Sequence, residues 1–159
     1  MSILDSGERR EFDTGAVRDI KQGVGRCDLL PLEIVYELME EDPVIENVYK
    51  FLQTVETAFL LNAFDEFCRV RQWDLSTALL ELSIHFEEGA KKYCENNWKK
   101  GIPIHSYIDS AVRHYLKWRR GDDDEPHDRA FLWNVICCIW TCHNKPEMND
   151  IERIVEKDE

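Results

Sequence analysis

Apolar residues recur at helical spacing along most of this chain, and proline, glycine and capping carboxylates interrupt the runs. No stretch of convincing length alternates between apolar and polar residues, and the sequence contains no internal repeat or low-complexity tract. The pattern therefore predicts an all-α protein. It predicts helical segments over residues 29–41, 45–71, 74–93 and 103–120, and a further helix that begins after Pro126.

The same breaks divide the chain into parts. A chain of 159 residues fits one domain, and folding at this size buries roughly two-thirds of the surface of the extended chain. We expect residues 1–27 to form a glycine-containing N-terminal arm, residues 28–143 a helical bundle, and residues 144–159 an acidic tail. No disulfide or metal is needed to hold a core of this size together.

Charge and composition limit the classes of partner. The net charge of -12 and the pI near 4.9 argue against general binding to nucleic acid or anionic membranes, because phosphate groups would be repelled. No apolar run approaches the roughly 20 residues of a membrane span, and the N-terminal residues lack the apolar core of a secretion signal. The six cysteines form no CxxC pair and are interpreted as reduced core thiols. We therefore expect a cytoplasmic protein that binds neither nucleic acid nor membrane.

The predicted helix over 74–93 carries a narrow polar stripe. Its members follow the spacing i, i+4, i+7 and i+11 and are Glu81, His85, Glu88 and Lys92. The opposite face is apolar, with Leu79, Leu82, Phe86, Ala90 and Tyr93. An ordinary amphipathic helix with a solvated stripe has this pattern. The alternative is that the stripe faces a cleft or a second subunit and that its carboxylates hold Mg²⁺, which prefers hard oxygen ligands.

The last two predicted helices carry polar residues on apolar faces. His114 lies on the flank of the apolar side of 103–120, where it must be hydrogen-bonded or take part in chemistry. Asn134 lies within a helix that is apolar nearly all round, with His127 two turns before it, so Asn134 either bridges helices or contacts a ligand. The acidic residues before this helix form a solvated cap or add a metal ligand. They are Asp122, Asp123, Asp124, Glu125 and Asp128.

Four blocks of sequence resemble a known family. They are FDTGAVRDIKQGVGRCDLLP (12–31), EEGAKKYCENNWKKGIP (87–103), YIDSAVRHYLKW (107–118) and DDDEPHDRAFLWN (122–134). In this order they are similar to the phage-associated dATP/dGTP diphosphohydrolase family, which is related to the all-α nucleoside triphosphate pyrophosphohydrolases of MazG type. The resemblance extends over residues 12 to about 142, and residues 43–73 match none of its blocks and are interpreted as a helical insertion.

The resemblance implies Mg²⁺-dependent (or Mn²⁺-dependent) hydrolysis of purine deoxynucleoside triphosphates to the monophosphate and pyrophosphate, in the cytoplasm of a phage-infected host. It suggests catalytic roles for Glu88, Asp109 and His114. The candidate metal ligands are Glu81, Glu87, Glu88, Asp109 and Asp124. The candidate nucleotide-binding residues are Arg18, Lys21, Arg26, Lys92, Trp98, Arg113, His127 and Asn134.

The sequence departs from the wider MazG pattern of Glu-Glu-x-x-Glu followed by Glu-x-x-Asp. Glu87 and Glu88 are followed by Gly89 and Lys91, and Ser106 stands three residues before Asp109. Three alternatives therefore stay open: an enzyme, a non-catalytic viral protein that sequesters a nucleotide or a nucleotide-derived defence signal, and a helical interaction module. In each case the surplus of aromatic residues and the polar stripes predict a homo-oligomer.

Overall fold

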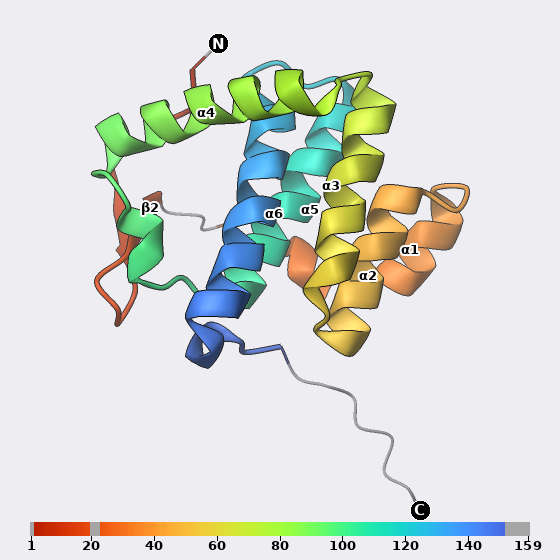
Figure 1. The fold of residues 1–159 in the computed structure, drawn as a ribbon, viewed down its shortest axis with the longest axis horizontal. Helices are drawn as coiled ribbons and strands as arrows, with labels where there is room; N and C mark the ends of the chain where they lie inside the picture. Colours follow the sequence, from red (N-terminus) through yellow and green to blue (C-terminus); the bar gives the residue numbers. More distant parts are fainter. Residues whose placement is uncertain (1, 20–22, 152–159) are drawn as a thin grey trace, which may run out of the picture.

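The computed structural model describes residues 2–19 and 23–151 and has an all-α architecture, as predicted (Figure 1). Within these residues the α-helices are α1 (Leu32–Leu38), α2 (Pro43–Thr54), α3 (Thr57–Arg71), α4 (Leu75–Lys92), α5 (Ile104–Arg120) and α6 (His127–Asn144). Short 3₁₀ turns are η1 (Cys27–Leu29), η2 (Asn97–Lys100) and η3 (Pro146–Met148). One antiparallel hairpin, which the sequence pattern did not predict, consists of β1 (Arg9–Glu11) and β2 (Val17–Asp19).

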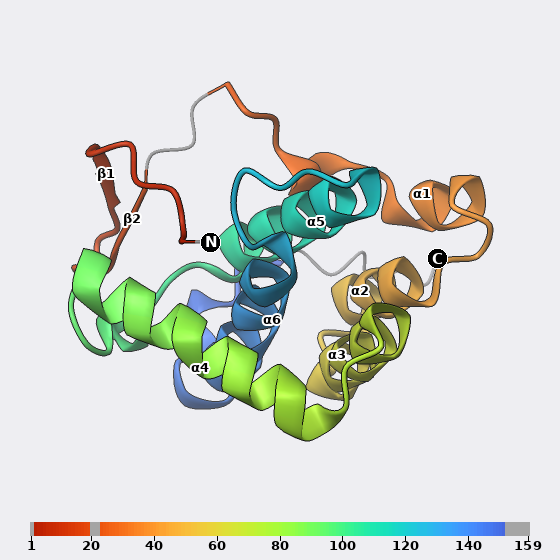
Figure 2. The same cartoon turned by 90° about the horizontal axis from the view of Figure 1, so that it is seen from above.

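The helices α5 and α6 form the centre of the molecule. A short connection sends α6 back along α5, and α3 packs against α6 on the side away from the hairpin (Figures 1 and 2). The helix α4 crosses α6 at a steep angle, whereas α2 packs on α3 and α1 packs on α2 at the other end of the molecule (Figure 1). Both α1 and the hairpin therefore lie at the periphery, on opposite sides of the central pair.

The core between α3, α5 and α6 is aromatic. The ring of Phe67 lies 4.7 Å from Phe131, 5.0 Å from Trp118 and 6.1 Å from Tyr115, measured between centroids. Each fully buried side chain of this size stabilises the fold by roughly 1.5–3 kcal/mol. Because Phe67 belongs to the segment 43–73, that segment forms part of the same core.

The ends of the early helices differ from the pattern. Glu40 and Glu41 have φ angles of 55° and 60°, so α1 stops before the predicted end at 41. Asp42, expected to close a helix, instead begins α2 and accepts hydrogen bonds from the amides of Val44 (2.9 Å) and Ile45 (3.0 Å). The predicted segment 45–71 is two helices, because Val55 at φ 58° turns the chain between them.

The amphipathic prediction for α4 holds in part, because Leu82 of the predicted apolar face is buried, but the helix is rotated relative to that prediction. Leu79, Leu80 and Ile84 are 45%, 70% and 39% exposed, whereas His85 of the polar stripe is buried. The reason is that α4 rests on α6 through the side that carries His85, whose ring lies 6.0 Å from that of Trp133. No helix of the described residues is long and apolar enough to cross a membrane.

The side-chain amide of Asn97 is one of the groups that hold the hairpin against the helical part of the molecule. Gly15 at φ +87° allows a tight turn in which its N–H donates to the carbonyl of Phe12 (2.8 Å). The side chain of Asn97 accepts from the N–H of Val17 (2.9 Å) and donates to the carbonyl of Val17 (2.7 Å). This pair of bonds holds β2 against η2 and so fixes the position of Arg18.

Candidate functional site

A cavity of about 490 Å³ lies between β2, α4, η2 and α6. Val17, Arg18 and Asp19 line one wall, α4 and η2 contribute Phe86, Lys92 and Trp98, and α6 contributes Trp133 and Asn134. Ile3 and Leu4 of the N-terminal arm also line it, and His114 and Glu125 lie at its far end. A cavity of this size accommodates a ligand with the dimensions of a nucleotide.

The guanidinium of Arg18 is the central cation of the cavity. It donates to Ser110 Oγ (3.2 Å) and Asn134 Oδ1 (3.1 Å), and its Cζ lies 5.7 Å from the ring of Trp133. Burial lowers the pKa of Arg18, but an arginine side chain stays protonated in a protein. Among the described residues no carboxylate lies within ion-pair distance of Arg18. An anionic ligand would supply the missing counter-charge.

Two further polar atoms beside this cation have no hydrogen-bond partner within the described parts of the chain. They are Nδ1 of His85 and Nε1 of Trp133, and both are buried. Burial lowers the pKa of His85 to about 3, helped by the positive charges of Arg129 and Arg18, so its imidazole is neutral near pH 7. Buried polar atoms of this kind cost on the order of 1–3 kcal/mol each when unpaired, a cost that a hydrogen bond to water or to a polar ligand would remove.

The second cation of the cavity, Lys92, is already neutralised. Its Nζ lies 3.4 Å from Asp19 Oδ2 and also donates to the carbonyl of Leu4. The N–H of Asp19 donates to the hydroxyl of Tyr93 (2.8 Å), which holds β2 against the end of α4. Lys92 therefore holds the N-terminal arm at Leu4 and has its charge balanced by Asp19. Arg18 is the better anion-binding group.

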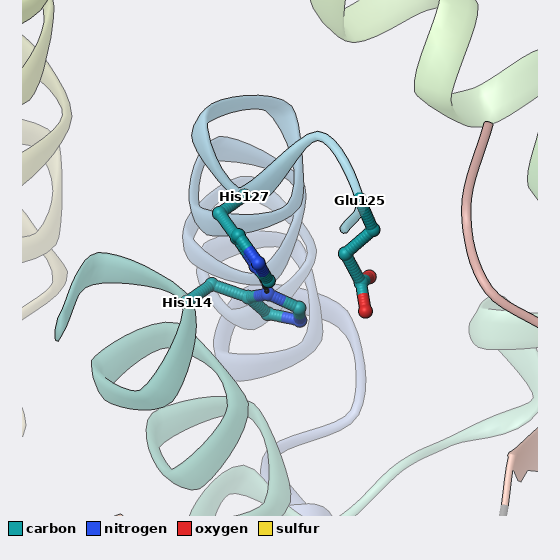
Figure 3. A group of neighbouring side chains, drawn as sticks. All are labelled: His114, Glu125 and His127. Carbon is teal, nitrogen blue, oxygen red and sulfur yellow. Dashed lines mark hydrogen bonds between the residues drawn. The ribbon is translucent and has the colours of Figure 1, made fainter. Parts of the chain in front are cut away.

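At the far end of the cavity two imidazoles meet a carboxylate (Figure 3). The Nδ1 atoms of His114 and His127 are 2.9 Å apart, and both side chains are buried. Glu125 projects from the turn that precedes α6 (Figure 3). One of its carboxylate oxygens and one nitrogen of each ring all lie within 4.8 Å of one another.

The backbone explains why Glu125 and His127 share this place. Pro126, at φ -77° and ψ 80°, is the centre of an inverse γ-turn in which the N–H of His127 donates to the carbonyl of Glu125 (2.9 Å). On the other side of the ring, Nε2 of His127 lies 2.7 Å from Asp124 Oδ1. This hydrogen bond lowers the pKa of Asp124.

The structure brings part of the predicted site together. Of the predicted nucleotide-binding and catalytic residues, five line the cavity: Arg18, Lys92, Trp98, His114 and Asn134. His127 lies beneath the cavity against His114. Arg26 is exposed and pairs with Asp28 at 2.5 Å, and Arg113 bonds to Asp109 and to the carbonyl of Gly25. Lys21 lies outside the described residues.

The predicted metal ligands are not gathered at one point. Glu88 accepts from Arg129 (3.3 Å) and from the N–H of Ile3 (3.2 Å), while Asp109 accepts from Arg113 and from the N–H of Cys27 (2.7 Å). Glu87 lines the cavity but is exposed, and its Oε1 lies 3.8 Å from Nζ of Lys91. Among the described residues, neither group of side chains close enough to hold one ion contains Glu81, Glu87, Glu88 or Asp109. Asp124 belongs to one of them, with Asp122 and His127.

Sequence reasoning missed several residues of the cavity. His85 was seen only as part of a polar stripe, and Glu125 only as one member of an acidic run. Trp133 and Asn97 carried no signal, because a tryptophan among apolar residues and an asparagine in a turn are both common. The Pro126 turn between Glu125 and His127 was the one local clue that these two side chains share a site.

The fold and the cavity define an all-α protein with a cavity lined by a cation, Arg18, and by polar and aromatic side chains. The model of the family described as dATP/dGTP diphosphohydrolase, N-terminal, matches residues 69–151. Because this match covers more than half of the chain, the chain belongs to that family, as the four sequence blocks indicated. The matched region contains α4, η2, α5 and α6, and at the family level it identifies a diphosphohydrolase with a nucleotide substrate. Comparisons with curated proteins and with solved structures found no match.

Proposed function

We propose that the protein hydrolyses purine deoxynucleoside triphosphates, dATP or dGTP, to the monophosphate and pyrophosphate within this cavity. The family supports the reaction class. The observation that carries the proposal is the guanidinium of Arg18, which has only neutral hydrogen-bond partners among the described residues and lies beside unpaired atoms of His85 and Trp133. A phosphate group would supply the missing counter-charge of Arg18.

The reaction adds one water across a phosphoanhydride bond. The water oxygen bonds to the α-phosphorus, the bond from that phosphorus to the bridging oxygen breaks, and pyrophosphate leaves with the electron pair while the water proton is released. Protein groups contribute mainly by positioning the phosphates and by neutralising charge. A divalent cation, Mg²⁺ or Mn²⁺, is part of the proposal because a triphosphate must approach a chain of net charge -12.

Aromatic rings at the opposite end of the cavity suit the purine. Phe86 and Trp98 both line the cavity, and their ring centroids are 5.8 Å apart. A base that stacks on these rings would extend its phosphates towards Arg18 and the histidines beyond it. Asn134, which already bonds to Arg18, would then orient the phosphate-binding group.

The test is a turnover assay with each deoxynucleoside triphosphate in the presence of Mg²⁺ or Mn²⁺, with pyrophosphate as the measured product. Loss of a charged contact to phosphate is worth roughly 1.5–3 kcal/mol, so Arg18→Gln should lower kcat/KM by about ten- to a hundredfold. The matched control is Arg10→Gln on the neighbouring strand, where the guanidinium donates to Ser106 and does not line the cavity. Equal effects of the two substitutions would contradict the assignment of Arg18.

A second candidate is a non-catalytic protein that sequesters a nucleotide. It is favoured by one observation, namely that Glu88 and Asp109 are each bonded to an arginine. Tight binding without metal, and no product from any nucleotide, would identify the sequestering protein. Pyrophosphate release at a rate that depends on Arg18 would exclude it.

A further inference from the structure

The cluster of His114, His127 and Glu125 has the arrangement of a metal site and differs from the carboxylate set that the sequence suggested. It places two imidazole nitrogens and one carboxylate at the end of the cavity, with both imidazoles buried. Buried histidines that point their ring nitrogens at each other need either a shared proton or a shared cation between them.

The contact with Asp124 decides which ring atom of His127 carries the proton. The carboxylate can only accept, so Nε2 of the neutral imidazole, 2.7 Å away, donates to it. Nδ1 of His127 is then unprotonated and directs its lone pair towards Nδ1 of His114. A carboxylate that accepts from the outer nitrogen of a histidine is the usual support of a metal-ligating imidazole, because it fixes the tautomer and the orientation of the ring.

The spacing of the ligand atoms fits a single ion. At a metal–nitrogen distance of roughly 2.0–2.1 Å, two neighbouring ligands are separated by roughly 2.8–3.4 Å, from octahedral to tetrahedral angles. The two Nδ1 atoms are 2.9 Å apart, and a carboxylate oxygen of Glu125 lies within 4.8 Å of one nitrogen on each ring, so a rotation of this half-buried side chain would complete the set.

We infer that His114, His127 and Glu125 bind one divalent transition-metal ion, with Asp124 as the outer support. Two imidazoles and one carboxylate favour Zn²⁺, Co²⁺, Fe²⁺ or Mn²⁺ over Mg²⁺, which prefers oxygen ligands. Three protein ligands leave a position for water, and His114 and Glu125 both line the cavity, so that position opens to the ligand.

The role of the ion towards a nucleotide rests on the proposed function. Ser110, which accepts from Arg18, stands one helical turn before His114 on α5, or about 6 Å along the helix axis. An ion at this place would lie beside a phosphate held by Arg18. It would lower the pKa of its bound water, which would then supply the oxygen that attacks phosphorus.

Ion binding by the purified chain tests the site without any nucleotide. The measurements are equilibrium dialysis against Zn²⁺ and Mg²⁺, with metal content determined by mass spectrometry, and the shift of the melting temperature on adding Zn²⁺. The wild type should bind one Zn²⁺ per chain in preference to Mg²⁺ and melt at a higher temperature with it. Glu125→Gln should weaken binding at least about tenfold, and His114→Gln should abolish it.

The control is Asp123→Asn, which removes a carboxylate from the same acidic run at an exposed position outside both ion-sized groups of the described residues. It should bind Zn²⁺ like the wild type. If His114→Gln fails to fold, as judged by circular dichroism, Glu125→Gln in the turn decides the result.

Absence of Zn²⁺ binding, or equal binding by wild type and Glu125→Gln, as expected if the ion sits on cysteines, would overturn the inference. Ion binding that follows these variants without any nucleotide turnover would keep the site and remove the proposed function. Turnover with Mg²⁺ that is unaffected by Glu125→Gln would do the reverse.

Discussion

Single residues in this protein make interactions that the local sequence does not predict. Asp42 begins α2 by accepting from two amides and also accepts from the hydroxyl of Tyr115 on α5, so one buried carboxylate joins helices far apart in the chain. His85 of α4 is a second example, because its imidazole is buried against α6 and its Nδ1 has no hydrogen-bond partner among the described residues.

The burial of His85 predicts a dependence of stability on pH. Its pKa is lowered from 6.5 to about 3 in the folded chain, so below pH 6.5 the unfolded chain takes up a proton that the folded chain does not. Stability from this residue is therefore present above pH 6.5 and lost as the pH falls towards 3, by up to about 1.4 kcal/mol per pH unit. Urea unfolding at pH 7 and pH 5 should show a loss of about 2 kcal/mol in the wild type that is absent in His85→Gln. The same loss in both proteins would show that other groups cause it.

At the scale of the elements, helix ends are where this chain departs most from its hydrophobic pattern. Left-handed residues at Val55 and Gln72 end α2 and α3, and both are residue types with no preference for that conformation. The hairpin is the opposite case, because its turn uses Gly15, a residue type that readily adopts the left-handed conformation. Two three-residue strands are then enough to place Arg18.

The exposed end of α3 offers a stabilising substitution. Gln72 has φ 60° and ψ 37° and is exposed, so Gln72→Gly removes backbone strain without removing buried surface. We expect a gain of about 0.5–1 kcal/mol in the free energy of unfolding, measured by denaturant titration. The matched control is Gln53→Gly within α2, an exposed position with helical geometry, where glycine should instead cost up to about 1 kcal/mol. A loss at position 72 would contradict this reading of the helix end.

At the scale of the whole molecule, the outer half of α4 remains apolar. Leu75, Leu79, Leu80 and Ile84 are all at least 39% exposed, and the opposite side of the same helix forms a wall of the cavity. A second copy of this chain that covers these side chains would bury them and would also stiffen the cavity wall.

We therefore expect the purified protein to form a homo-oligomer through α4. Size-exclusion chromatography with light scattering should give a mass above 18.8 kDa for the wild type and close to it for Leu80→Glu. Leu38→Glu, at an equally exposed leucine of α1, is the control and should leave the assembly intact. A monomeric wild type at working concentration would exclude this arrangement.

The sequence predicted the helical class and the positions of α4, α5 and α6, because long periodic runs and the punctuation at Asp74 and Gly121 determine them locally. It also named Arg18 and Asn134 as candidate nucleotide-binding residues; they lie in separate blocks, and their side chains meet at 3.1 Å. It could not tell which neighbour each polar face would meet. Glu88 and Asp109 were expected to hold metal, but each accepts a hydrogen bond from an arginine: Glu88 from Arg129 of α6, and Asp109 from Arg113 one turn further along the same helix.

The double hydrogen bond between Asn97 and β2 has a consequence for ligand length. One side chain joins the strand that bears Arg18 to the turn that bears Trp98. Because the strand and the turn are tied together, the separation between the guanidinium of Arg18 and the ring of Trp98 is constrained. In the proposed binding mode, the carboxamide of Asn97 would therefore contribute to selection of the nucleotide by the length of its polyphosphate.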